Sequence, residues 1–256
     1  MQSDVNKRRA MRQKKARRRR LKIAFIMFII ISLITLAIMC FTVFFPIKRI
    51  NVSGSEIYSK GQIVKASKLT TEDNLFVVSE KTIEKNIRKS LPYIDEVKIK
   101  RVFPDAVILN VKDANEFAYY ITDNQNYILS ENGYVLKQQA DTPQNVFEIV
   151  TNGITGKVGE KAKYKNSAEQ ELVDVIIKEV AKKGINVDKI DVSDSLNLTL
   201  NAEGRFIVTL GNSEYIQEKI AHLAGMIESI PDRKGKINLS MWTPTNSQGS
   251  FVEETT

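Results

Sequence analysis

An uncharged run of 23 residues, 23–45, is the feature that most constrains this chain, and only Ser32, Thr35 and Thr42 within it are polar. As an α-helix rising about 1.5 Å per residue, the run extends about 34 Å, enough to cross a hydrocarbon core of about 30 Å with a modest tilt. A cleaved signal peptide is the alternative, but the run is long for one and no small-residue cleavage motif precedes Pro46. We therefore predict a single transmembrane helix over residues 23–45.

Basic residues are concentrated immediately before this run. Eleven Lys or Arg lie between Lys7 and Lys22, and Asp4 is the only acidic residue before the run. Cytoplasmic flanks of membrane spans are enriched in Lys and Arg, so the basic tail, residues 1–22, is predicted to stay in the cytoplasm against the anionic inner leaflet. The residues predicted to determine this topology are Arg17, Arg18, Arg19, Arg20 and Lys22. Binding of the tail to nucleic acid or to a cytoplasmic partner is the alternative.

The remainder of the chain is close to neutral, with 27 basic and 29 acidic residues. This balance argues against a nucleic-acid partner for the folded part. The single cysteine, Cys40, lies inside the apolar run, so neither a disulfide framework nor a cysteine metal site is expected beyond it.

Residues 46–113 show the periodicities of a small α+β unit with the order β-α-α-β-β. Residues 47–52 alternate as a short strand, and Ser59 and Ser79 are candidate N-caps of two amphipathic helices. Two further alternating stretches separated by a turn follow within residues 97–111. Two helices over a three-stranded sheet would bury a small core.

Residues 114–242 are predicted to form a larger, mixed β-rich domain with two helices. The helices are expected over residues 167–183, with Gly184 just past the end, and over residues 213–230. Short strands are expected at residues 117–121, 127–129, 134–137, 196–200 and 206–210.

The stretch at residues 236–242, KINLSMW, is predicted to be the last strand. If it is a sheet edge, its free N–H and C=O groups can pair with a strand of another chain, with Trp242 on the polar face as an anchor. The candidate partner-binding residues are Ile237, Asn238, Leu239, Ser240, Met241 and Trp242. The alternative is that Trp242 packs over the neighbouring strand or the preceding helix. The polar residues 243–256 are predicted to be a flexible tail.

No catalytic, cofactor or metal constellation is recognisable. His222 is the only histidine and lies between core positions of a helix, without a motif that supplies a nucleophile. The glycines of residues 153–159 lack the Lys-Ser/Thr pair of a phosphate loop and are predicted turns. The carboxylates predicted on the solvated face of the 167–183 helix are Glu169, Glu171 and Glu179. The chain is therefore not expected to be an enzyme.

Several segments together resemble the DivIB/FtsQ family of bacterial division proteins. They are the basic tail, the single span, residues 47–63 with V-x-G, Asn74-Leu75-Phe76, LPYIDEVKIKR at residues 91–101, and Phe103-Pro104. The sequence departs from the family pattern at residues 113–116, where Asp-Ala-Asn-Glu replaces the frequent Glu-Arg-x-Pro, and at Ser130, where Asp is usual. These departures leave the overall pattern intact.

The resemblance implies a POTRA domain followed by a β domain, and a non-catalytic scaffold of the division machinery at the septum. It implies binding to the bitopic DivIC/FtsB-type and FtsL-type proteins and no small-molecule substrate. Two rival functions are a membrane-tethered cell-wall enzyme and an extracytoplasmic sensor that signals inward.

Overall fold

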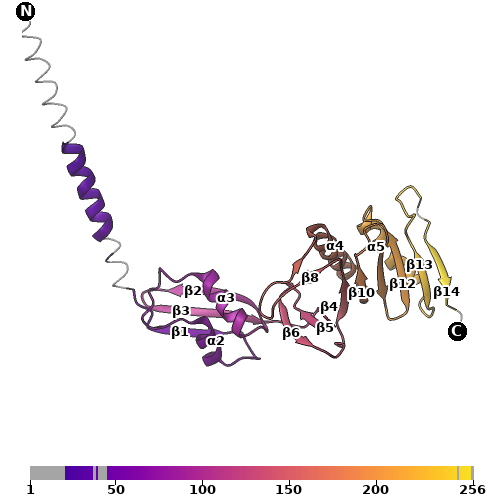
Figure 1. Cartoon of the computed structure of the whole chain (residues 1–256), viewed down its shortest axis with the longest axis horizontal. Coiled ribbons are helices and arrows are strands. Elements are labelled where there is room, and N and C mark those ends of the chain that lie inside the picture. Colours follow the sequence, from indigo (N-terminus) through magenta and orange to yellow (C-terminus); the bar gives the residue numbers. More distant parts are fainter. Residues whose placement is uncertain (1–20, 37–38, 40–44, 247, 255–256) are drawn as a thin grey trace, which may run out of the picture.

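The computed structural model describes residues 21–36, 39, 45–246 and 248–254. Residues 21–36 are helical, and their large apolar side chains are exposed. Within these described ranges, none of the helices combines the length and apolar character needed to cross a bilayer. The predicted span extends over residues 37–38 and 40–44, which lie outside the described residues. Two folded units follow the N-terminal helix, and the C-terminus lies at the opposite end of an elongated chain (Figure 1).

The first unit has the predicted element order. Its elements are β1 (Arg49–Ser53), α2 (Lys60–Ser67), α3 (Glu80–Ser90), β2 (Ile94–Val102) and β3 (Ala106–Asp113). The sheet order is β1-β3-β2, with β1 parallel and β2 antiparallel to the central β3. Both helices pack on this sheet, and their apolar residues form one cluster with it.

Local capping explains where the two helices of the first unit begin. The Ser59 side chain accepts a hydrogen bond from the backbone N–H of Gln62, and the Gln62 side chain accepts one from Ser59, which completes a capping box. Ser79 accepts from the backbone N–H of Thr82 at the start of α3. These side chains satisfy N–H groups that have no partner inside a helix, so both predicted starts are confirmed.

The second unit is built on a nine-stranded sheet with the order β14-β13-β12-β11-β10-β7-β4-β5-β6. The sheet's strands are β4 (Ala118–Thr122), β5 (Gln125–Leu129), β6 (Val135–Gln139), β7 (Phe147–Val150), β10 (Val187–Asp191), β11 (Leu198–Ala202), β12 (Phe206–Gly211), β13 (Gly235–Asn238) and β14 (Ser250–Glu253). A two-stranded ribbon, β8 (Ile154–Thr155) and β9 (Lys163–Tyr164), stands apart from it. Strands β7, β10 and β14 were not anticipated from the sequence.

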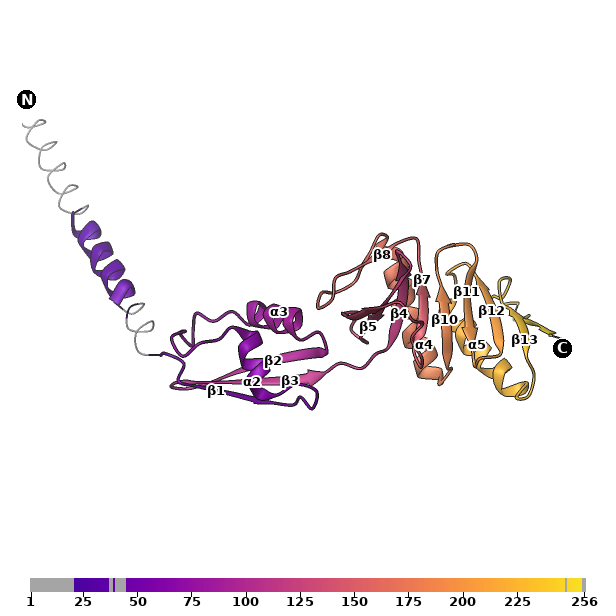
Figure 2. The ribbon, with the colours of Figure 1, turned by 60° about the horizontal axis from the view of Figure 1, so that its bottom comes forward.

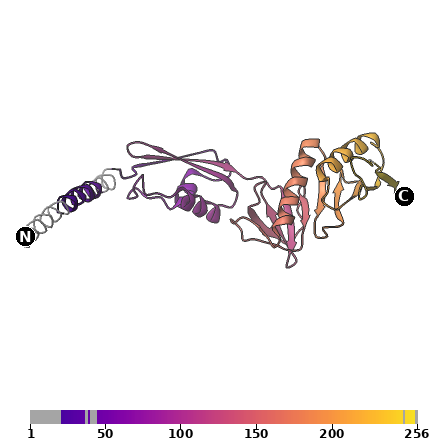
Figure 3. The same ribbon diagram turned by 90° about the horizontal axis from the view of Figure 1, so that it is seen from above.

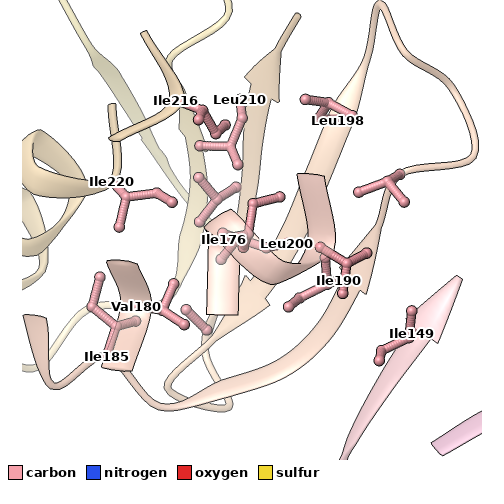
Figure 4. Packing of buried hydrophobic residues seen from close by; sticks show 14 of the residues in the cluster. Ile149, Ile176, Val180, Ile185, Ile190, Leu198, Leu200, Leu210, Ile216 and Ile220 are labelled. Carbon is pink, nitrogen blue, oxygen red and sulfur yellow. The ribbon is translucent and has the colours of Figure 1, made fainter. Parts of the chain in front are cut away.

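Two helices cover one face of the large sheet (Figures 2 and 3). They are α4 (Ser167–Lys183) and α5 (Ile216–Ser229), and α4 has the predicted bounds with Gly184 as its left-handed C-cap. Between helices and sheet lies a single apolar core, in which Ile176 and Ile220 are fully buried. Figure 4 shows Ile176 of α4 facing Leu200 and Ile190 of the sheet. Helix-on-sheet packing therefore stabilises the second unit.

Replacing Ile176 by Ala is expected to destabilise the second unit by about 2–5 kcal/mol, because it leaves a cavity in a fully buried site. The only tryptophan, Trp242, packs in the same core, so its fluorescence during urea unfolding reports on this unit. Leu196→Ala is the matched control, since the Leu196 side chain is 78% exposed. Equal unfolding midpoints for the two variants would contradict the assignment of the core.

Candidate partner-binding site

The predicted C-terminal strand is shorter than expected and is not a sheet edge. Strand β13 ends at Asn238 and pairs with β12 on one side and with β14 on the other. The chain then turns, with the backbone N–H of Trp242 donating to the carbonyl of Leu239. The expectation that residues 236–242 form an open edge is therefore wrong, because a later segment completes the hydrogen bonds of β13.

Trp242 is buried and does not anchor an exposed polar face. It is 8% exposed, and its ring lies 5.7 Å from the ring of His222 on α5. Within the described part of the chain, its indole N–H has no hydrogen-bond acceptor. The alternative in which Trp242 packs on the preceding helix is the one that the structure shows. Ile237 and Leu239 are also buried, whereas Asn238 and Met241 are exposed.

Strand β14 forms the edge instead. It pairs with β13 through Asn238↔Ser250 to Gly235↔Glu253, in a segment predicted to be part of a flexible tail. That expectation is wrong for the four residues of β14, because the antiparallel pairing fixes their backbone. No further strand pairs with β14 among the described residues.

The register determines which backbone groups of β14 point outward. The N–H of Glu254 donates to the carbonyl of Lys234, so these two residues are a hydrogen-bonded pair. Hydrogen-bonded and non-bonded pairs alternate along an antiparallel ladder, and Gly235 and Leu239 donate to β12 rather than to β14. The backbone N–H and C=O groups of Phe251 and Glu253 therefore face the open edge.

The side chains of β14 divide between core and surface. Phe251 packs edge-to-face with Phe206 at 6.2 Å between ring centroids. Val252 is 63% exposed and lies in register with Lys236 of β13, which in turn pairs with Ile207 of β12. Ile207 is 48% exposed. An open edge thus borders a partly apolar sheet face, and strand addition draws its affinity from main-chain hydrogen bonds at such an edge.

Ion pairs flank this edge, but they lie on the surface. Arg233 and Glu253 are 3.8 Å apart, and Lys234 and Glu254 are 3.2 Å apart, with all four side chains more than half exposed. Exposed pairs of this kind contribute little to stability. They leave the charges at the edge accessible to another chain.

A set of polar contacts, which the sequence did not reveal, joins the two folded units. Asp95 of β2 is buried and accepts hydrogen bonds from the Ser130 hydroxyl at 2.9 Å and from the Asn132 side chain at 2.6 Å. Arg88 of α3 donates to the Asp95 carbonyl, and its guanidinium lies 4.0 Å above the ring of Tyr134. Ser130, noted only as a departure from the family pattern, thus bonds directly to the first unit.

Glycine is required where the 153–159 segment touches the first unit. Gly159 has a φ of +83°, and a Cβ atom there would lie 2.5 Å from the carbonyl oxygen of Arg88. This left-handed conformation and close approach favour glycine. The predicted turn is therefore confirmed at Gly159, which rests on the end of α3, whereas residues 154–155 of the same segment form β8.

A further contact runs through the segment that connects the two units. Glu116 accepts a hydrogen bond from the Tyr93 hydroxyl at 2.6 Å and forms an ion pair with Lys137 of β6, also at 2.6 Å. Burial raises the pKa of the Glu116 carboxyl, but the hydrogen bonds from Lys137 and Tyr93 outweigh it and hold the pKa below its ordinary value. Burial, together with this carboxylate, raises the pKa of Tyr93. The contact of Glu116 with Tyr93 and Lys137 therefore favours the charged form of the Glu116 carboxylate.

The buried charged side chains of the second unit make hydrogen bonds within the fold. The prediction that Glu169 and Glu179 are solvated is wrong, because both side chains are buried. Glu169 accepts hydrogen bonds from the backbone N–H and from the side chain of Asn152, each at 2.9 Å. Lys219, not anticipated, is 1% exposed and donates to the carbonyl of Leu210 at 2.7 Å. Burial lowers its pKa, against the opposing charge of Glu214. Among the described residues no group of three His, Cys, Asp or Glu side chains suits a metal ion.

The predicted topology-determining residues are only partly described. Lys22 lies in the helical segment 21–36 and is exposed. Arg17, Arg18, Arg19 and Arg20 lie outside the described residues.

Comparison with known proteins connects this architecture to bacterial division. Residues 45–113 match the family model of the POTRA domain, FtsQ-type. The chain is 27% identical to the cell division protein DivIB of Clostridium tetani over 75% of this chain and 74% of that protein. It is 26% identical to DivIB of Clostridium botulinum over 87% and 88% of the two chains, and 23% identical to the cell division protein FtsQ of Streptomyces coelicolor over 80% and 78%.

The resemblance predicted from the sequence is confirmed by these matches. The first unit is a POTRA domain of the FtsQ type, and the similarity to DivIB and FtsQ extends over most of the chain. A role in cell division is supported on the same grounds.

The contact of Glu116 is expected to make stability dependent on pH. Because its pKa is lowered on folding, the carboxylate contributes stability above the unfolded pKa of about 4.3, and this contribution is lost as pH falls through the lower folded value. Glu116→Gln is therefore expected to be less stable than the parent at neutral pH, with the difference shrinking on acidification. Urea unfolding at a series of pH values measures this, and a difference that is constant with pH would contradict it.

Proposed function

We propose that this chain is a non-catalytic, membrane-anchored scaffold of the bacterial division machinery at the septum. It binds DivIC/FtsB-type and FtsL-type proteins and thereby coordinates septal peptidoglycan synthesis. The observation that carries this proposal is the open edge of β14 at the end of the nine-stranded sheet. The similarity to DivIB and FtsQ over most of the chain supports the division role.

Partner binding on this proposal is strand addition at β14 and not at β13. The outward N–H and C=O groups of Phe251 and Glu253 supply the hydrogen bonds, and the exposed Val252 supplies apolar contact. Within the stretch first nominated, Ile237, Leu239 and Trp242 are buried in the core, and Ile237 is the register partner of Phe251 of β14. Among the other three residues, the exposed Met241 is available for direct contact, since its side chain is 79% exposed.

Membrane anchorage is the second part of the proposal. The cytoplasmic basic tail, residues 1–22, precedes a span over residues 23–45, so the POTRA and β domains face the extracytoplasmic side. The exposed apolar side chains of the helical segment 21–36 support this, because Leu21, Phe25 and Phe28 are each more than 60% exposed. So large an apolar surface is costly in water and suits a lipid environment.

The scaffold acts by assembly rather than by chemistry. Holding several bitopic proteins beside one membrane raises their effective concentration, so that weak contacts become a stable complex. A membrane-tethered cell-wall enzyme and an inward-signalling sensor remain the rival functions. Peptidoglycan turnover by the purified full-length chain would favour the enzyme.

A proline substitution in β14 tests whether the outward N–H groups of this strand bind the partner. Glu253→Pro removes an outward N–H while leaving the hydrogen bonds between β14 and β13 intact, so the fold is expected to persist. Binding to the DivIC/FtsB-type partner is expected to weaken about fivefold, corresponding to one backbone hydrogen bond of about 1 kcal/mol. Co-purification with the full-length chain and a binding titration measure this.

Glu253→Ala is the matched control, because it removes the same charge and the ion pair with Arg233 but keeps the N–H. Val252→Pro is the opposite control, since it removes an inward N–H and is expected to detach β14. Undiminished binding of Glu253→Pro would exclude pairing at this edge.

Topology is tested with a reporter that is active only outside the cytoplasm, fused after Thr256. The parent is expected to show reporter activity. Replacing Arg17, Arg18, Arg19, Arg20 and Lys22 by Gln is expected to reduce that activity, because the charge difference across the span falls. A parent fusion that faces the cytoplasm would overturn the proposed orientation.

A further inference from the structure

Three phenylalanine rings meet at the membrane-proximal end of the POTRA domain. Phe45 contacts Phe76 edge-to-face at 5.1 Å between centroids and Phe103 at 6.2 Å, and Phe76 lies 5.4 Å from Phe103. The three rings come from the entry to β1, the loop before α3 and the β2–β3 turn. We call these three residues and the adjoining Val77 the aromatic cap.

Backbone and side-chain hydrogen bonds hold the aromatic cap together. The N–H of Leu75 donates to the carbonyl of Phe45 at 2.9 Å, and the N–H of Ile47 donates to Asp73 at 2.8 Å. Arg101 donates to the carbonyls of Leu75 and Val78 at 2.9 and 3.0 Å. The loop that carries Phe76 and Val77 is therefore fixed to the segment at which the apolar run ends.

Three of the four residues of the aromatic cap are exposed despite their apolar character, and Phe45 is half-buried. Val77 is 70% exposed, Phe103 58% and Phe76 44%. The rings touch one another, and Phe103 and Val77 each keep more than half of their surface exposed. A contiguous apolar patch of this kind marks a site of interaction with a protein or a membrane.

We propose that the aromatic cap inserts into the headgroup region of the membrane that the proposed span crosses. This proposal rests on the proposed function, specifically on the span over residues 23–45. Phe45 is the last residue of that span and lies at the bilayer surface. Phe76 and Phe103 lie within about 6 Å of Phe45, and the headgroup layer on each side of the hydrocarbon core is about 5–8 Å thick. Both rings are therefore placed at headgroup depth.

The charges around the aromatic cap favour apolar insertion over electrostatic attraction. Lys48 is exposed and Arg49 is paired with Asp105 at 2.8 Å, while Arg101 is paired with Glu80 at 2.7 Å. Glu72 adds an exposed acidic group nearby in sequence. With both signs present, attachment depends on the rings, and aromatic and aliphatic side chains of amphipathic surfaces bury about 5–10 Å into the interface.

Insertion gives the POTRA domain a second attachment to the membrane besides the span. A single helix leaves the attached domain free to tilt and rotate, whereas a helix and an apolar surface together restrict both motions. The aromatic cap thus determines the orientation in which the domain leaves the membrane.

Tryptophan fluorescence in lipid vesicles tests the proposal on the full-length chain. Trp242 is the only tryptophan, so Trp242→Phe provides a dark background. Phe103→Trp and, separately, Val77→Trp place probes in the aromatic cap, and Leu196→Trp is the control, since Leu196 is 78% exposed in the second unit. Each variant is reconstituted into phosphatidylcholine vesicles with or without bromine on the acyl chains near the headgroup.

Both probes in the aromatic cap are expected to lose fluorescence in the brominated vesicles, and the Leu196→Trp control is expected to be unaffected. Equal emission in the two vesicle types, from a chain that floats with the vesicles, would overturn the proposal while leaving the span intact. Emission shifted to shorter wavelength without loss to bromine would show that protein covers the aromatic cap, and would also overturn it. A chain that does not float with the vesicles would overturn the span and this proposal together.

Discussion

The parallel pairing of β7 with β10 is the interaction on which the second unit depends. It joins β4–β7 to β10–β14 through Lys189↔Glu148, Ile190↔Ile149 and Asp191↔Val150, so that two small sheets become one. Helix α4 lies between the two strands in sequence, and its Ile176 faces Ile190 of β10 (Figure 4). Because every inner strand of this nine-stranded sheet is paired on both sides, β6 and β14 are its two outer strands among the described residues. β6 lies beside the POTRA domain, and β14 is left as the edge distant from it (Figure 1).

Features that depend on neighbouring residues could be predicted from the sequence. Ser59 and Ser79 cap their helices within three residues, and Gly184 ends α4 by adopting a left-handed conformation that costs glycine little. Sheet order depends instead on pairings between distant segments, which a single sequence does not specify. β14 escaped prediction because it is four residues long and polar at both ends, and its only requirement is the open side of β13.

The environments of buried polar and aromatic side chains were harder to predict from the sequence, because their partners also lie in distant segments. Helix α4 has apolar residues on more than one side, so the pattern alone did not distinguish the buried Glu169 from a solvated carboxylate. Its partner Asn152 lies 17 residues away in sequence, as the Ser130 that bonds Asp95 lies 35 away. Trp242 likewise followed an alternating stretch, but the strand ended four residues before it and the turn directed its ring onto α5.

On the proposed function, the contacts between the two units matter to binding, because the proposed partners would be anchored in the same membrane. A bitopic partner reaches β14 only if its own strand stands at the same height above the bilayer. Asp95 with Ser130, Arg88 with Tyr134, and Glu116 with Tyr93 and Lys137 all restrain the β domain relative to the POTRA domain. If the two units moved freely relative to each other, the distance of β14 from the bilayer would vary widely. The effective concentration of the β14 edge at the partner strand would then be lower. On that proposal, restraint between the units contributes to affinity without any contact to the partner.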